Sequence, residues 1–175
     1  MKNLVVMFPG AGYGLDSPLL YYADFLFETK GYERFRMNYQ DILSRLELPA
    51  VKRIELLREY VWKQVKDVDF NKYEEIVFLS KSIGTIEAGL VAEKLDVAVR
   101  QIFLTPTDEA LSYLKKDSRV VIGTKDKAYG LYKSYCEDNQ IEALFIEGAD
   151  HSLEIAKQPY TSIKVLGEVM HFIEE

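Results

Sequence analysis

Three residues spread along the chain have the types needed for acyl transfer, namely Ser82, Asp126 and His151. A serine hydroxyl is a poor nucleophile unless a base removes its proton. An imidazole can do this when a carboxylate fixes its tautomer and stabilises the imidazolium. Ser82 lies in the sequence S-x-S-x-G over residues 80–84, directly after an apolar run. This sequence differs from the nucleophile-elbow pattern G-x-S-x-G only at Ser80, where a small residue lets strand and helix pass closely.

Each of the three residues, taken singly, has a simpler interpretation. Ser82 could be a helix N-cap, Asp126 a turn residue and His151 an ordinary loop residue. Their order along the chain, each after a predicted strand, instead favours a catalytic triad with Ser82 as nucleophile. Asp108 follows another predicted strand and is a second candidate for the acid, but it is better interpreted as the start of a helix.

A glycine-rich loop, Pro-Gly-Ala-Gly-Tyr-Gly at residues 9–14, follows the first predicted strand. Its glycines allow a tight turn that points N–H groups at an anion. The dinucleotide fingerprint G-x-G-x-x-G is a competing interpretation, but Leu15 stands where the third glycine belongs. We therefore expect an oxyanion hole, with the N–H groups of Ala11 and Lys81 as donors. One such donor typically contributes about 3–4 kcal/mol to transition-state stabilisation.

The segments that must position these residues alternate between two hydrophobic patterns, one typical of strands and one typical of helices. Short apolar runs predict six strands, at residues 4–8, 32–37, 76–79, 99–104, 120–122 and 141–146. Helical spacing predicts helices over residues 19–29, 50–68, 83–95, 108–114, 129–137 and 159–173. This alternation indicates a single α/β domain over residues 1–175, a three-layer α/β/α sandwich around a mostly parallel sheet of about six strands. In such a sheet the site lies beyond the carboxyl ends of the strands.

Together the loops after the strands resemble those of the α/β-hydrolase superfamily, over essentially the whole chain. The likeness is to small members akin to dienelactone hydrolases and minimal serine esterases. The resemblance implies Ser82 as nucleophile, Asp126 as acid, His151 as base, and the Ala11 and Lys81 amides as the oxyanion hole. It also implies that the two strands that begin the full-size fold are missing and that no cap domain is inserted. The site should then be open, suited to a small or protruding acyl group.

Composition narrows the possible partners. The 175 residues carry 22 basic and 28 acidic side chains, a formal net charge of −6, which argues against nucleic acid as a partner. No stretch approaches the roughly 18 apolar residues of a membrane helix, so no membrane association is expected. One cysteine, Cys136, and two histidines argue against a disulfide and against a metal site. A lone cysteine is typical of a cytoplasmic protein.

These features predict a cytoplasmic serine hydrolase that cleaves the ester or thioester of a small-molecule acyl substrate, without metal or organic cofactor. Tyr13 and Tyr129 lie on loops that should face the pocket and are expected to touch the substrate. The Lys81 side chain is expected to be solvated. A non-catalytic binding or scaffold protein of the same fold is the alternative, favoured by Ser80 in the elbow. A nucleotide site on the glycine-rich loop is a third possibility, and the oligomeric state is left open.

Overall fold

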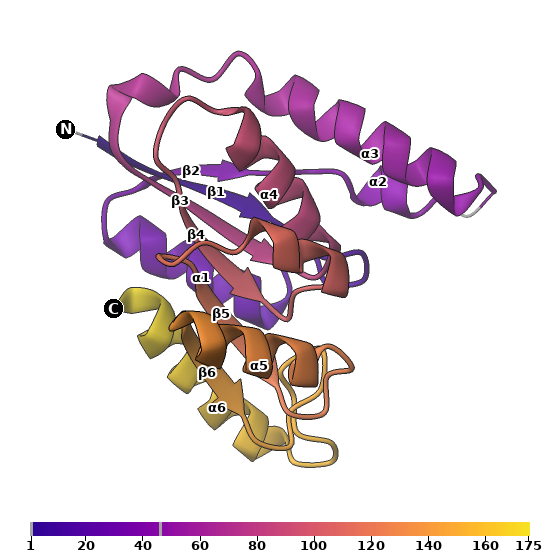
Figure 1. The fold of residues 1–175 in the computed structure, drawn as a ribbon, viewed down its shortest axis with the longest axis vertical. Helices are drawn as coiled ribbons and strands as arrows, with labels where there is room; N and C mark the ends of the chain where they lie inside the picture. Colours follow the sequence, from indigo (N-terminus) through magenta and orange to yellow (C-terminus); the bar gives the residue numbers. More distant parts are fainter. Residues whose placement is uncertain (1, 46) are drawn as a thin grey trace.

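A six-stranded parallel sheet forms the centre of the molecule, in the order β2-β1-β3-β4-β5-β6 (Figure 1). The computed structural model describes residues 2–45 and 47–175. Each strand pairs with its neighbours in parallel register. The strands are β1 (Lys2–Phe8), β2 (Glu33–Arg36), β3 (Tyr73–Lys81), β4 (Arg100–Leu104), β5 (Arg119–Gly123) and β6 (Glu142–Ile146). The predicted fold class, a three-layer α/β sandwich with about six strands, is therefore confirmed.

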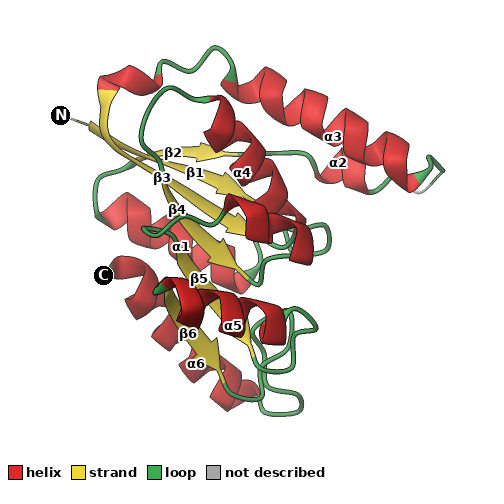
Figure 2. Ribbon diagram, viewed as in Figure 1, coloured by secondary structure: helices red, strands yellow, loops and turns green. Residues whose placement is uncertain are grey.

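Helices cover both faces of the sheet, as Figure 2 shows. Helices α1 (Pro18–Thr29) and α6 (Pro159–Glu174) share one hydrophobic core with the sheet. Helices α3 (Ala50–Val65), α4 (Ile83–Lys94) and α5 (Tyr129–Asn139) pack on the opposite face. Three short elements complete the chain, α2 (Gln40–Leu43), η1 (Phe70–Lys72) and η2 (Asp108–Tyr113).

Strand β3 shows how the sequence builds these two cores. Successive side chains of a strand point to opposite faces of the sheet. Accordingly Val77 and Leu79 pack towards α1 and α6, whereas Ile76 and Phe78 pack towards α3 and α4. Both faces are covered by helices, so the central strands read as continuous apolar runs, as in most parallel sheets.

Several element boundaries differ from those predicted. The helix expected over 50–68 ends at Val65, where a turn closes with the Val68 amide donating to the Val65 carbonyl. The helix expected over 108–114 is the 3₁₀ helix η2, a form common in short connections. Helices α2 and η1 were not predicted, because a segment of three or four residues has no detectable period.

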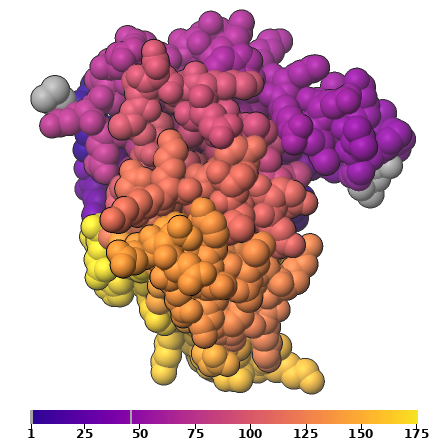
Figure 3. Space-filling view, viewed as in Figure 1, coloured from indigo at the N-terminus to yellow at the C-terminus, as the bar shows by residue number. Residues whose placement is uncertain are grey.

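The connection between β4 and β5 contains only the short η2, so no cap covers the sheet in the described part of the chain. The space-filling view shows α2 and the adjoining end of α3 projecting from the rest of the molecule (Figure 3). Both chain ends lie at the amino-terminal edge of the strands, away from the loops that follow them (Figure 1). No described helix is long and apolar enough to cross a membrane.

Candidate active site

Ser82 lies at a sharp turn between the end of β3 and the start of α4. Its backbone has φ 53° and ψ −125°, a conformation that L-residues rarely adopt. The Ser82 amide donates to the Leu104 carbonyl at 3.1 Å, and the Thr85 amide donates to the Ser82 carbonyl at 2.9 Å. Strain of this kind persists only where neighbouring contacts enforce it, and it is common at functional sites. The turn has the form of a nucleophile elbow, which lifts the serine hydroxyl clear of the sheet.

The two small residues that flank Ser82 allow this turn in different ways. A Cβ on Gly84 would collide with the backbone carbonyl oxygens of Phe8 and Pro9, so α4 starts in direct contact with the end of β1. Ser80 occupies the position of the first elbow glycine and is completely buried. Its hydroxyl donates to the Ile102 carbonyl at 3.2 Å, so the extra side chain is accommodated against β4.

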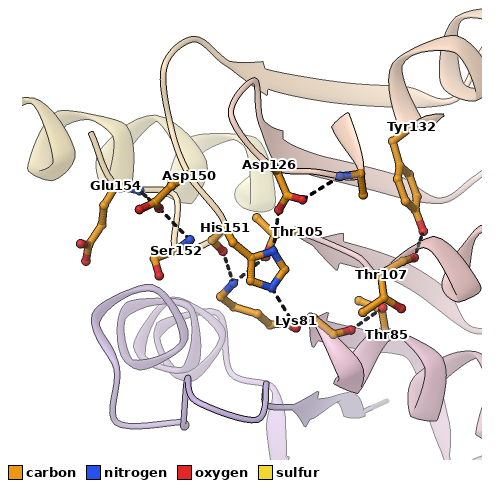
Figure 4. Close-up of polar contacts among 12 residues, drawn as sticks. Lys81, Thr85, Thr105, Thr107, Asp126, Tyr132, Asp150, His151, Ser152 and Glu154 are labelled. Carbon is orange, nitrogen blue, oxygen red and sulfur yellow. Dashed lines mark hydrogen bonds and ion pairs between the residues drawn. The ribbon is translucent and has the colours of Figure 1, made fainter. Parts of the chain in front are cut away.

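Asp126 and His151 come from the loops after β5 and β6, which cross closely at Gly123. A Cβ on Gly123 would collide with the Ala149 carbonyl, so only glycine allows the two loops to approach in this way. Nδ1 of His151 lies 2.5 Å from Oδ2 of Asp126, and Nε2 of His151 lies 2.9 Å from Oγ of Ser82. The structure thus brings together the three residues predicted from the sequence. Figure 4 shows the His151 ring facing the Asp126 carboxylate.

Asp126 and His151 differ in exposure. The Asp126 side chain is completely buried, and its Oδ1 accepts from the Ala128 amide at 3.0 Å. The His151 side chain is 46% exposed. The carboxylate is therefore held in one orientation, while the imidazole remains accessible from the solvent side. This combination suits a group that must exchange protons with Ser82 and with a substrate.

The two predicted oxyanion donors, the N–H groups of Ala11 and Lys81, lie in different surroundings. Gly10 packs against Ser82, since a Cβ on Gly10 would lie 3.2 Å from the Ser82 Cβ, and Ala11 follows it on an exposed turn. The prediction for the Lys81 amide was wrong. Lys81 precedes the serine as the last residue of β3, in register with Leu104 of β4. Ile83 instead begins α4, where the first N–H groups of a helix have no intrahelical acceptor.

The Lys81 side chain is also placed differently from the prediction of a solvated lysine. Lys81 is 1% exposed, and its Nζ donates to the Thr105 hydroxyl at 2.5 Å and to the His151 carbonyl at 2.7 Å. The ammonium lies 4.8 Å from the centre of the Tyr13 ring. Burial lowers the pKa of Lys81 to about 8, while the negative charges of Asp126 and Asp150 act in the opposite direction. Lys81 thus ties the His151 loop to the end of β4 (Figure 4).

The two tyrosines expected to touch a substrate lie in different surroundings. Tyr13 is half-buried beside Lys81, and its hydroxyl accepts from the Leu19 amide at 3.0 Å. It lines a hollow next to the His151 loop. Tyr129 begins α5 and packs edge-on against Phe145, with 5.6 Å between the ring centres. Tyr129 does not line that hollow.

Two residues that the sequence analysis did not single out hold the glycine-rich loop. The Tyr39 hydroxyl donates to the Pro9 carbonyl at 2.7 Å, and the Gln40 amide Nε2 donates to the Gly10 carbonyl at 2.8 Å. Both follow β2, and no motif marks them in the sequence. The Gly10 carbonyl belongs to the same planar peptide unit as the Ala11 N–H group, so its hydrogen bond with Gln40 restricts the orientation of that N–H group.

The glycine-rich loop also borders a polar hollow of about 550 Å³ at the carboxyl ends of β1 and β2. Its one arginine, Arg36, is already paired with Asp16 at 3.0 Å and lies 3.8 Å from Asp24. Among the described residues that line this hollow, no unpaired cation is therefore left for a phosphate group. Across residues 2–45 and 47–175, no three His, Cys, Asp or Glu side chains are grouped as metal ligands.

Comparison with known proteins identifies the fold. No protein-family model and no curated protein matches the sequence. The structure is similar to a Xanthomonas campestris protein described within the alpha/beta superfamily of hydrolases (14% identity, TM-score 0.62, covering 98% of this chain and 99% of that one). It is also similar to a dienelactone hydrolase from Anabaena variabilis (16% identity, TM-score 0.61, covering 97% of this chain and 84% of that one). A third similar structure is that of Est1E from Butyrivibrio proteoclasticus with ferulic acid bound (12% identity, TM-score 0.60, covering 100% of this chain and 90% of that one). The chain therefore has the α/β-hydrolase fold.

Proposed function

We propose that this chain is a serine hydrolase that cleaves a carboxylic ester or thioester through an acyl-enzyme on Ser82. The observation that carries the proposal is the 2.9 Å contact between Nε2 of His151 and Oγ of Ser82. The partner of Nδ1 is the buried carboxylate of Asp126, so Nδ1 holds the proton and Nε2 is free to accept one. A dienelactone hydrolase among the fold neighbours supports the same class of chemistry.

Acylation begins when Oγ of Ser82 adds to the acyl carbonyl carbon while its proton passes to Nε2 of His151. The resulting imidazolium is stabilised by the negative charge of Asp126. The carbonyl oxygen gains the negative charge, and the N–H groups of Ala11 and Ile83 are the proposed donors to it. The imidazolium then gives its proton to the leaving alcohol or thiol as the C–O or C–S bond breaks.

Deacylation uses the same groups, with water as the nucleophile and Oγ of Ser82 as the leaving group. A water molecule gives a proton to Nε2 of His151 as its oxygen adds to the acyl carbon of the Ser82 ester. Collapse of this second tetrahedral intermediate breaks the bond to Oγ, and the imidazolium returns the proton to Ser82. The free acid leaves, and the protein is regenerated without any external reactant other than water.

Labelling with a fluorophosphonate probe, followed by mass spectrometry, tests the proposal. We expect one adduct on Ser82 in the native protein, none there in Ser82→Ala, and labelling near background in His151→Ala. Ser134→Ala, a matched change on the exposed side of α5, should label like the native protein. Absence of an adduct on Ser82 in protein shown to be folded by circular dichroism would falsify the hydrolase proposal.

A binding or scaffold protein remains the alternative outcome of this test. The feature that favours it is Ser80, but the buried Ser80 hydroxyl points to the Ile102 carbonyl and leaves the contact of Ser82 with His151 intact. The structure therefore adds no support for a non-catalytic role.

A further inference from the structure

A hollow of about 340 Å³ lies on the α1/α6 side of the sheet, next to the His151 loop. Its walls come from the glycine-rich loop, the start of α1, the segment over residues 152–158 and the part of α6 from Pro159 to Val169. Its lining residues include Tyr13, Leu19, Ser152, Leu153, Leu166 and Val169. We call this space the apolar hollow.

The apolar hollow lies near Ser82 and His151, although these two residues do not line it. A Cβ on Gly10 would lie 3.2 Å from the Ser82 Cβ and 3.6 Å from the Tyr13 Cβ. Gly10 is therefore packed against both Ser82 and Tyr13. On the other wall, Ser152 directly follows His151. A chain attached to Ser82 would therefore have to pass Tyr13 and Ser152 to reach the hollow.

Among the described residues that line the apolar hollow, none of those on its inner surface is charged. Leu19, Leu153 and Val169 are buried, and Leu166 is half-buried. The charged lining residues, Glu154 and Lys157, are both exposed. An ion inside would lose its hydration without gaining a partner, whereas an apolar group gains free energy on entry.

The segment that closes the hollow is held in a defined shape. Oδ1 of Asp150 accepts from the Ser152 amide at 2.8 Å and from the Glu154 amide at 3.1 Å. Leu153 and Lys157 both have φ 61°, a strained conformation for non-glycine residues. A wall held in this way does not need to be ordered when a ligand binds, which favours affinity.

We propose that the apolar hollow receives the acyl chain of the substrate, so that the protein prefers uncharged aliphatic acyl groups of medium length over acetyl groups. This inference rests on the proposed function of Ser82. The volume is near the lower end of ligand pockets, which run from about 300 to 1,000 Å³. It therefore suits a medium chain and excludes a long lipid tail.

A chain-length series of p-nitrophenyl esters tests the assignment. We expect kcat/KM to rise about fourfold for each methylene from acetate to hexanoate, the factor that corresponds to burial of one methylene, and to fall for dodecanoate. Leu166→Trp, which fills the hollow, should lower the hexanoate-to-acetate ratio at least tenfold. Ile163→Glu places a charge on an exposed lining residue and should lower the same ratio without disturbing the core. Leu131→Glu, on the exposed side of α5 outside the hollow, should leave the ratio unchanged.

The outcomes separate this inference from the proposed function. If Ser82 is labelled but the ratio is the same in the native protein, Leu166→Trp and Ile163→Glu, the hollow is not the acyl site and the hydrolase proposal stands. If Ser82 is not labelled, binding of octan-1-ol to Ser82→Ala is measured by thermal shift, with Ser82→Ala/Leu166→Trp as control. Thermal stabilisation of Ser82→Ala but not of Ser82→Ala/Leu166→Trp by octan-1-ol supports an apolar binding site in the hollow. If octan-1-ol does not stabilise Ser82→Ala, the inference is overturned.

Discussion

The ammonium nitrogen of Lys81 lies 2.7 Å from the backbone carbonyl oxygen of His151, in a position that is almost fully buried. The residue directly before the proposed nucleophile thus holds the loop that carries the proposed base. Burial lowers the pKa of Lys81 to about 8, against 10.5 for an exposed lysine. Between these two pH values the unfolded chain binds a proton that the folded protein does not, so stability rises with pH across this window.

Lys81→Met should therefore change the pH dependence of stability. At pH 7 the variant escapes the cost of a buried charge but leaves the Thr105 hydroxyl and the His151 carbonyl without their donor. The free energy of unfolding of the variant minus that of the native protein should become about 3 kcal/mol more negative between pH 7 and pH 10.5. The reason is that the native protein gains stability as its buried lysine loses its proton. Urea unfolding at both pH values measures this difference. A difference that does not change with pH would contradict a buried ammonium, and Lys133→Met, at an exposed lysine, is the matched control.

Glu87, in α4, should show the opposite pH dependence. Its side chain is 2% exposed, and burial raises its pKa to about 7, although Arg58, 4.0 Å away, and Lys94 lower it. The folded protein therefore holds a proton that the unfolded chain releases between about pH 4.5 and 7, and stability falls as pH rises through this window.

Glu87→Gln imitates the protonated carboxyl group and should remove this loss. We expect the variant to be more stable than the native protein by up to about 3 kcal/mol at pH 8 and equal to it at pH 4. Thermal unfolding at the two pH values is the measurement. Glu93→Gln, at an exposed position on the same helix, should show no such pH dependence. Equal melting temperatures of Glu87→Gln and the native protein at pH 8 would show that Glu87 is not held in an unfavourable charged state.

Much of the fold was predictable because buried parallel strands are short apolar runs that end abruptly at turn residues. The run before Ser80 and the run before Gly123 both carry this signal, and each leads directly to a proposed functional residue. Loops that follow parallel strands meet at one edge of the sheet. Residues more than 60 positions apart in the sequence, such as Ser82 and His151, could therefore be placed together before their contact was seen.

What could not be predicted depends on side-chain direction and on contacts between loops. The burial of Lys81 was missed, although the alternation of a strand places it on the same face as Val77 and Leu79. A charged residue at a strand end is usually solvated, and only the positions of Thr105 and the His151 carbonyl provide its partners. The apolar hollow was also beyond sequence reasoning, because its walls come from four separate segments.

Ser80→Gly restores the usual elbow sequence and tests whether Ser80 impairs the site. The Ser80 hydroxyl bonds to the Ile102 carbonyl, on the β4 side of the turn, and makes no hydrogen bond to Ser82 or His151. We expect the rate of fluorophosphonate labelling to change by less than about threefold. Loss of a buried hydrogen bond and added backbone freedom should lower the free energy of unfolding by roughly 1–2 kcal/mol. A tenfold faster labelling rate would instead mean that Ser80 distorts the elbow.

Asp126→Asn separates the orienting role of this residue from its structural role. The change keeps the size of the side chain, and Oδ1 can still accept from the Ala128 amide. An amide NH₂ group facing Nδ1 of His151, however, donates a hydrogen bond to Nδ1. It therefore forces the ring into the tautomer with its proton on Nε2, which cannot accept a proton from Ser82. We expect kcat for p-nitrophenyl hexanoate to fall by about 10³–10⁴, with KM little changed, as in other serine triads. Asp150→Asn, beside His151 but facing backbone amides, should lower kcat far less, because its Oδ1 contacts only the loop. If the two variants lost activity equally, Asp126 would be a structural support of the loop and not the group that sets the tautomer of His151.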